Sequence, residues 1–158
     1  MVPTPLQRLA DLGYGLPEAP VPQFSYVPTA RVPISSDRAL LFIAGQISAR
    51  DGVLMTGRVP DTCSPEQAQE AARASALNIL AQIEAECGLD KVIAVAQVTG
   101  YVNSSPEFDA HPTVINAASD LIVGVFGEIG RHTRVALGVA ALPRGVTVEI
   151  SAIVVVRP

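Results

Sequence analysis

The chain has 158 residues, which is the size of one domain and long enough to bury a hydrophobic core. Apolar residues make up 49% and charged residues only 16% of the sequence, which excludes an intrinsically disordered chain. The formal net charge of -4, the 4% of aromatic residues and the absence of Trp leave no basic track or stacking platform for nucleic acid. The low charged fraction also indicates surface hidden in an oligomer.

The N-terminus and the cysteines favour a reduced, cytoplasmic protein. The opening MVPTPLQRLADLG has no basic segment followed by an apolar one, so we expect no signal peptide. We also expect no apolar segment that is long enough and free enough of charge to cross a membrane. Cys63 and Cys87 are too few for a disulfide framework and flank one predicted helix, so packing roles are expected for both.

Residues 1–38 are predicted to form a proline-rich N-terminal arm, and residues 39–158 a single domain. Seven of the 13 prolines fall between Pro3 and Pro33, which leaves room for only a short helix at 6–12. Because the arm carries Tyr14, Phe24 and Tyr26, we expect it to lie along the body or along a neighbouring subunit.

The first half of the domain reads as two strands and a long helix. A buried strand is predicted at 39–47, and a hairpin turn leads to a short strand at 53–56. Ser64, Pro65 and Gln67 form a helix-start pattern, in which the serine caps the helix and the glutamine stands three residues later. This helix is predicted to end at Cys87, before Gly88.

The second half completes the order β-β-α-β-α-β-β. Strands are predicted at 91–103, 133–142 and 146–156, with a second helix at 112–128. The last strand offers apolar side chains to both faces of a sheet, whereas two helices cover only one face. We therefore predict a homo-oligomer in which further copies cover the other face.

Arg134 and Glu149 stand inside strand-like sequence, where charges are rare unless something pairs with them. They are either a structural ion pair or the polar end of a binding pocket. An arginine fork matches a carboxylate, and a buried glutamate with a raised pKa serves as a general acid or base. If the last two strands form a direct hairpin, the two residues lie about 17 Å apart. They would then share a pocket only across a subunit interface or through a less simple strand order.

Other candidate sites are weaker. His111 and His132 are a helix apart and form no metal-ligand pattern, so no metal is expected. The glycines at 124, 127 and 130 follow no strand and do not form a phosphate-binding loop. No nucleotide or other organic cofactor is expected.

Four motifs together resemble the YjgF/RidA family, whose members have also been labelled L-PSP endoribonucleases or translation inhibitors. They are GQI at 45–47, NSSPEF at 103–108, VINAAS at 114–119, and the spacing from Arg134 through an LP pair to VEI at 148–150. The resemblance implies an α+β, chorismate-mutase-like fold with a mixed sheet backed by two helices. It also implies homotrimers with ligand clefts between subunits.

The same resemblance implies hydrolysis of reactive enamines and imines of amino-acid metabolism to 2-keto acids and ammonia, without a cofactor. Arg134 matches the arginine that holds the substrate carboxylate, and Glu149 the glutamate that handles the attacking water. Gly45, Tyr26 and Asn116 match residues that line the cleft.

Two departures from the family pattern keep other functions open. Ala44 stands where active deaminases carry a serine, and Ala136 where they carry a cysteine or threonine. These losses favour a non-catalytic trimer that binds small carboxylates as a sensor or metabolite sink. Endoribonuclease activity is a third hypothesis, which the acidic net charge disfavours.

Overall fold

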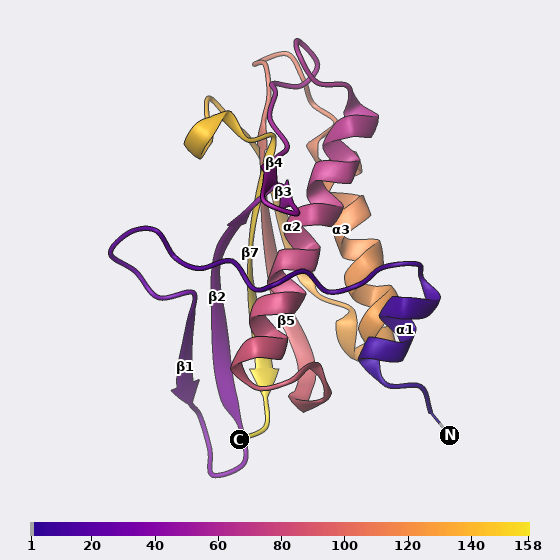
Figure 1. Ribbon diagram of the computed structural model, residues 1–158, viewed down its shortest axis with the longest axis vertical. Coiled ribbons are helices and arrows are strands. Elements are labelled where there is room, and N and C mark those ends of the chain that lie inside the picture. The colour runs from indigo at the N-terminus through magenta and orange to yellow at the C-terminus, as the bar shows by residue number, and fades with distance from the viewer. Residues whose placement is uncertain (1) are drawn as a thin grey trace.

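A five-stranded mixed sheet forms the centre of the computed structural model, which describes residues 2–158 (Figure 1). The strand order is β1-β2-β7-β5-β6, and only the β5–β6 pair is parallel. The strands are β1 (Thr29–Pro33), β2 (Ala39–Ile47), β5 (Val92–Asn103), β6 (Thr133–Val139) and β7 (Val148–Val156). A separate two-stranded hairpin, β3 (Ala49–Arg50) and β4 (Val53–Leu54), follows β2.

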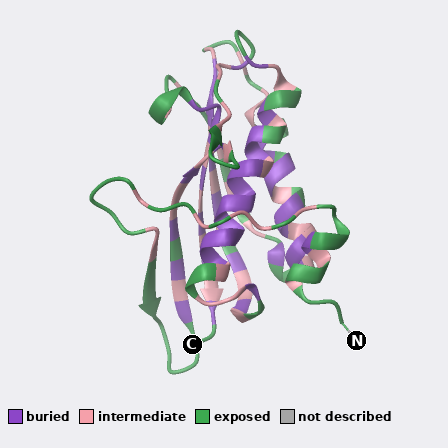
Figure 2. Ribbon diagram, in the orientation of Figure 1, coloured by how far each residue is buried: buried purple, intermediate pink, exposed green. Residues whose placement is uncertain are grey.

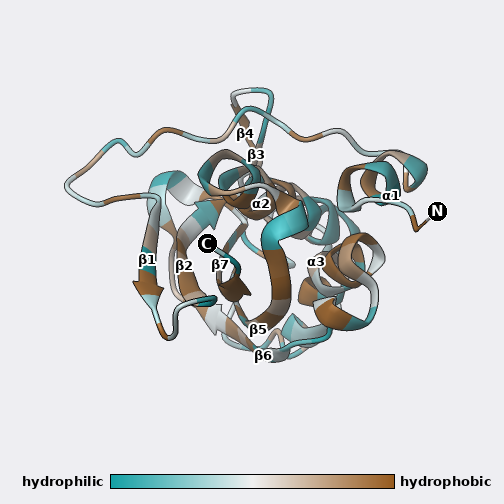
Figure 3. Cartoon of the chain, turned by 90° about the horizontal axis from the view of Figure 1, so that it is seen from below, coloured by the Kyte–Doolittle hydropathy of each residue, from teal (hydrophilic) through white to brown (hydrophobic). Residues whose placement is uncertain are grey.

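Both long helices lie on the same side of this sheet (Figure 3). They are α2 (Pro65–Glu86) and α3 (His111–Phe126); a short helix α1 (Pro5–Asp11) precedes the sheet, and 3-10 turns η1 (Leu89–Lys91), η2 (Gly127–Gly130) and η3 (Pro143–Gly145) complete the chain. The predicted α+β architecture with two helices behind a mixed sheet is therefore confirmed. Its consequence is that the opposite face of the sheet carries no helix.

The start of α2 follows from its sequence. The Ser64 side chain accepts a hydrogen bond from the Gln67 amide at 3.2 Å, and the Gln67 side chain accepts one from the Ser64 amide at 2.9 Å. This reciprocal cap satisfies amides that the first helical turn leaves without partners. The apolar face of α2 then packs on the sheet, with Leu80 and Ile83 at most 1% exposed.

The stretch His111–Gly130, comprising α3 and η2, is long and apolar enough by composition to span a membrane, contrary to the sequence expectation. Half of its most apolar window is buried within the fold, and α3 packs against α2, α1 and β6. Val114, Ile115 and Val125 are completely buried there. The hydropathy of α3 is accounted for by its place in the core.

Side chains of β7 alternate between the two faces of the sheet. Val148, Ile150 and the following even-numbered residues are buried beneath the helices, whereas Glu149 and the other odd-numbered residues are only partly covered (Figure 2). On the same uncovered face, Phe42 is 39% and Leu137 49% exposed. We call this helix-free side of the sheet the open face.

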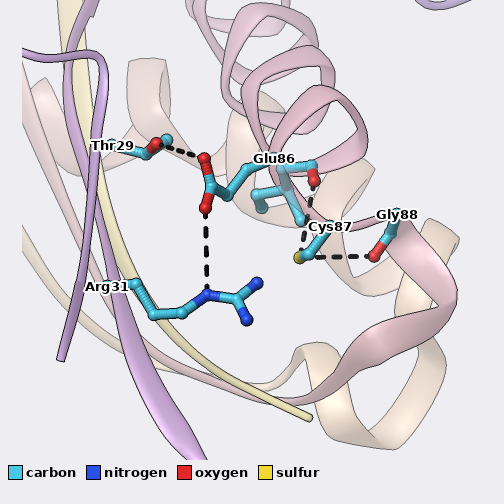
Figure 4. Close-up of polar contacts among 6 residues, drawn as sticks. Thr29, Arg31, Glu86, Cys87 and Gly88 are labelled. Carbon is cyan, nitrogen blue, oxygen red and sulfur yellow. Dashed lines mark hydrogen bonds and ion pairs between the residues drawn. The ribbon is translucent and has the colours of Figure 1, made fainter. Parts of the chain in front are cut away.

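The N-terminal segment is more structured than a simple arm. It crosses over α2 (Figure 1), where the Gln82 side chain donates a hydrogen bond to the Pro20 carbonyl at 2.7 Å. Its last part forms β1, which pairs antiparallel with β2 and is tied to the end of α2 (Figure 4). There Thr29 donates to the Glu86 carboxylate at 3.0 Å, and Arg31 forms an ion pair with it at 3.8 Å. The sheet thus begins within residues 1–38.

The last two strands do not form a hairpin, because β5 lies between β6 and β7. β5 pairs in parallel with β6, matching Val98 with Arg134, and antiparallel with β7, matching Tyr101 with Glu149. The relation between Arg134 and Glu149 therefore depends on β5.

Candidate functional site

Arg134 lies on edge strand β6 and turns toward α3. Its pairing partner Val98 is completely buried beneath the helices, and paired residues of neighbouring strands share a face of the sheet. The Arg134 Nη1 donates to the Asn116 Oδ1 at 2.8 Å and to the Ser119 Oγ at 3.2 Å. Arg134 is half-buried. The predicted neighbours Arg134 and Asn116 are therefore in direct contact.

These two bonds determine which side of the guanidinium remains available. A guanidinium Nη carries two protons, and both protons of the Arg134 Nη1 have an acceptor within the chain. Among residues 2–158, no hydrogen bond from Nε or Nη2 and no carboxylate within 4.0 Å of this guanidinium is found. The Nε–Nη2 edge can therefore receive a carboxylate through two parallel hydrogen bonds.

His132 contacts the serine that holds Arg134. The His132 Nε2 lies 3.0 Å from the Ser119 Oγ, and its Nδ1 lies 2.6 Å from the Gly130 carbonyl oxygen. Since a carbonyl oxygen only accepts, Nδ1 carries a proton. Ser119 thus bridges His132 and Arg134.

Glu149 lies on the open face. Its partner on β5 is Tyr101, and its partner on β2 is Ile47. Burial raises the pKa of the Glu149 carboxyl above its ordinary value. Within the described part of the chain, this carboxyl has neither an ion-pair partner nor a side-chain hydrogen bond. A partly desolvated carboxyl of this kind is suited to exchanging protons.

Gly45 lies directly against the Glu149 carboxyl. The register of β2 against β7 shifts between Ile43 and Gln46, which is a bulge containing Ala44 and Gly45. A Cβ at Gly45 would overlap the Glu149 Oε1 and come within 2.9 Å of its Cδ. Glycine at this position is therefore what allows the backbone and the carboxyl to approach so closely.

Tyr26 lies in the loop before β1, and the chain that follows it passes beside the bulge. The Ala44 amide donates to the Pro28 carbonyl at 2.9 Å, which fixes the backbone two residues beyond Tyr26 beside the bulge. The Tyr26 side chain is 50% exposed. The structure therefore ties the backbone after Tyr26 to the bulge that contains Gly45.

The structure therefore divides four of the five predicted residues into two groups. Arg134 and Asn116 lie on the helix side of the sheet at β6, whereas Glu149 lies on the open face at β7 with Gly45 against its carboxyl. For Tyr26, the structure fixes the following backbone beside the bulge, through Pro28. Within one chain, Arg134 and Glu149 form no ion pair, so the interpretation as an intrachain structural pair is wrong. Two surface hollows of about 570 and 350 Å³ lie elsewhere and include none of the five residues.

Other reactive side chains in the described part of the chain are weaker candidates for a functional site. Cys63 is buried and Cys87 half-buried, both are free thiols, and burial raises the pKa of each. Residues 2–158 contain no group of three His, Cys, Asp or Glu side chains arranged to hold a metal ion. His111 Nε2 lies 2.9 Å from the Ser104 Oγ, at the other end of α3 from His132.

Sequence reasoning did not connect Ser119 and His132 with Arg134. Ser119 stands three residues after Asn116 on one helix, a spacing that places both side chains on the same face. His132 precedes Arg134 by two residues, the spacing that puts strand side chains on one side. Either spacing, applied around the predicted Arg134 and Asn116, would have identified them.

Comparison with known proteins agrees with this architecture. The sequence model of the family described as endoribonuclease L-PSP matches residues 17–156. The chain belongs to this family, which is the one that its sequence motifs indicated.

Individual relatives cover nearly the whole chain. Protein TCP17 of Trypanosoma cruzi is 42% identical over 150 residues, which cover 93% of this chain and 91% of that protein. The crystal structure of Atu1372 from Agrobacterium tumefaciens, a protein of unknown function, is 40% identical with a TM-score of 0.85, covering 97% of this chain and 92% of that one. The structure of E. coli TdcF with bound serine is 26% identical with a TM-score of 0.55, covering 90% and 94%.

Proposed function

We propose that this protein hydrolyses reactive enamines or imines derived from amino acids, releasing a 2-keto acid and ammonia. The reaction takes place without a metal or organic cofactor, in clefts between the subunits of a homotrimer. The free thiols of Cys63 and Cys87 fit the reducing cytoplasm, where such intermediates arise.

The observation that carries this proposal is the available edge of Arg134. Asn116 and Ser119 occupy both protons of Nη1, so the guanidinium is held before a ligand arrives and its Nε–Nη2 edge is directed to a carboxylate. A pre-positioned bidentate donor favours an anion with two coplanar oxygens, such as a carboxylate, over a neutral group. TdcF, a structural relative, binds serine, an amino acid of the size expected for such a substrate.

Glu149 supplies the proton transfers. An enamine first gains a proton on carbon and loses one from nitrogen, which gives the imine. Water attacks the imine carbon and loses a proton, while the nitrogen gains one; the resulting carbinolamine then loses its hydroxyl proton, gains one on nitrogen, breaks its C–N bond and releases ammonia. Each step moves a proton from one atom of the substrate or water to another, which one carboxyl can mediate if its pKa lies nearer neutrality than usual. The upward pKa shift of Glu149 has this direction.

Assembly brings the two groups of residues together. The open face carries exposed apolar residues on three of its strands, among them Val32, Phe42, Val135 and Leu137. A face of this kind is covered by other copies of the same chain. We propose that Arg134 of one subunit faces Glu149 of the next, so that the cleft is complete only in the oligomer; the trimeric state follows from the family resemblance.

A non-catalytic carboxylate-binding trimer is the second candidate. Ala136 lies on the same side of β6 as Arg134, and Ala44 lies in the bulge beside Gly45. Neither side chain has a hydroxyl or thiol that could hold a water. Arg134 would then bind the carboxylates of 2-keto acids, and no reaction would be catalysed. The family's endoribonuclease description receives less support, because the net charge of -4 opposes binding to a polyanion.

The test measures loss of enzymatically generated 2-aminoacrylate by the wild-type protein and by Arg134→Ala. Arg131→Ala is the matched control, because Arg131 is 72% exposed and pairs only with Glu128 at 3.6 Å. We expect turnover in the wild type and the control and none in Arg134→Ala, with all three sedimenting alike. Full activity of Arg134→Ala would refute the proposal. No turnover, together with pyruvate binding that requires Arg134, would establish the second candidate.

A further inference from the structure

We propose that His132 is a positioning residue for Arg134 and acts through the hydroxyl of Ser119. This inference deepens the proposed function, because Arg134 is the residue that would hold the substrate carboxylate. The hydrogen bonds on which it rests are features of the fold and do not depend on any substrate.

The three side chains form a directed series of hydrogen bonds. Arg134 Nη1 donates to the Ser119 Oγ at 3.2 Å, and the Ser119 Oγ lies 3.0 Å from the His132 Nε2. In the neutral imidazole, the proton on Nδ1 leaves Nε2 as an acceptor, so the serine hydroxyl donates its single proton to His132. The lone pairs of the Ser119 oxygen are then directed at Arg134. His132 therefore determines the direction of the hydroxyl that holds the guanidinium.

The other end of the series is fixed to the protein backbone. The His132 Nδ1 donates to the Gly130 carbonyl at 2.6 Å, in the last turn of η2. Gly130 is packed against α3 so closely that a Cβ there would come within 2.9 Å of the Ile122 carbonyl oxygen. Thr133, between His132 and Arg134, donates its hydroxyl to the Ala96 carbonyl at 2.8 Å. Both the imidazole and the start of β6, directly after His132, are thus held in place.

Two substitutions of His132 separate its two hydrogen bonds. The amide of Asn occupies the place of the imidazole Nδ1, and that of Gln reaches the place of Nε2. His132→Gln can therefore still accept the Ser119 proton, whereas His132→Asn can only reach the Gly130 carbonyl. We expect His132→Asn and Ser119→Ala each to raise the KM for the imine about tenfold, with kcat within about twofold. Ser119→Ala removes the hydrogen bond that the serine accepts from the charged guanidinium, and His132→Asn leaves the serine hydroxyl that makes this bond without its orienting partner. His132→Gln should keep a wild-type KM. The double variant Ser119→Ala/His132→Asn should have no higher KM than Ser119→Ala alone, because both substitutions act on the same contact.

A second readout needs no substrate. In protein labelled with nitrogen-15 arginine, bonds that stop rotation of the guanidinium separate the Nη1 and Nη2 signals of Arg134, which are assigned by their loss in Arg134→Lys. We expect separate signals in the wild type and in His132→Gln, and averaged signals in Ser119→Ala and His132→Asn. His111→Asn is the matched control, because His111 also hydrogen-bonds a serine through Nε2, at 2.9 Å; it should leave the Arg134 signals unchanged.

The outcomes separate this inference from the proposed function. Averaged signals in His132→Asn and separate signals in His132→Gln support the positioning role even if the wild type turns over no imine, a result that would refute only the deaminase. Wild-type signals in His132→Asn would overturn the positioning role. Averaged Arg134 signals in both His132→Asn and His132→Gln, together with a lower melting temperature of both variants, would overturn the positioning role as well. This result would show that His132 only stabilises the fold.

Discussion

Replacement of Gly45 by alanine tests whether the position of Glu149 matters for catalysis. The added Cβ would lie 2.9 Å from the Glu149 Cδ and 3.2 Å from its Cγ, in addition to overlapping the Oε1. Carbon atoms in contact are normally about 3.5–4.0 Å apart, so the carboxyl must move by about 0.6–1.1 Å. Misplacement of a reacting group by about 1 Å costs roughly 100-fold in rate. The end of a glutamate side chain is flexible, so we expect the stability to fall by only about 1 kcal/mol.

The assay is steady-state hydrolysis of 2-aminoacrylate, with thermal unfolding and sedimentation of each variant. We expect Gly45→Ala to lower kcat about 100-fold and to leave KM unchanged, because the added Cβ meets only Glu149 and leaves the hydrogen bonds that hold Arg134 in place. Gly15→Ala is the control, since no atom lies within 4 Å of a Cβ at Gly15. A wild-type kcat in a normally assembled Gly45→Ala protein would refute the role assigned to Glu149.

Two further predictions concern stability and assembly. Because the pKa of Glu149 is higher in the folded than in the unfolded chain, its favourable contribution is present at acid pH and is lost as pH rises through the folded pKa. Urea unfolding at fixed protein concentration should therefore show Glu149→Gln gaining stability over the wild type as pH rises through this range, and a pH-independent difference would contradict the shift. Leu137→Glu places a charge on the open face and should weaken self-association at least ~100-fold in sedimentation equilibrium. Val53→Glu should not, because Val53 is 68% exposed on the separate hairpin; an oligomer unaffected by Leu137→Glu would exclude the open face as the interface.

The parts of the fold that depend on local sequence could be predicted. The cap at Ser64 involves residues three apart, and the alternation in β7 is a property of one strand, so both are visible in the sequence. β1 was hidden in the proline-rich segment, although Pro33 is compatible with an edge strand, where a missing amide proton disturbs no ladder.

The strand order could not be predicted in the same way. The position of β5 between β6 and β7 depends on pairing between distant segments, which local sequence patterns do not reveal. This order decides that Arg134 and Glu149 lie on different sides of the sheet, so individual site residues were predictable but their arrangement was not. Ser119 and His132 were missed for a related reason, because a serine or histidine acquires a role only from the side chain it contacts.

Because β5 separates Arg134 from Glu149 within one chain, the proposed site can take these two residues from different subunits. If each cleft takes its arginine from one chain and its glutamate from the next, Arg134→Ala and Glu149→Gln proteins fail for different reasons and can repair each other. Random assembly from an equal mixture, after dissociation and refolding, would leave about a quarter of the clefts with both residues intact. Two inactive preparations would then recover about a quarter of the wild-type turnover when assembled together, and none when simply combined without subunit exchange.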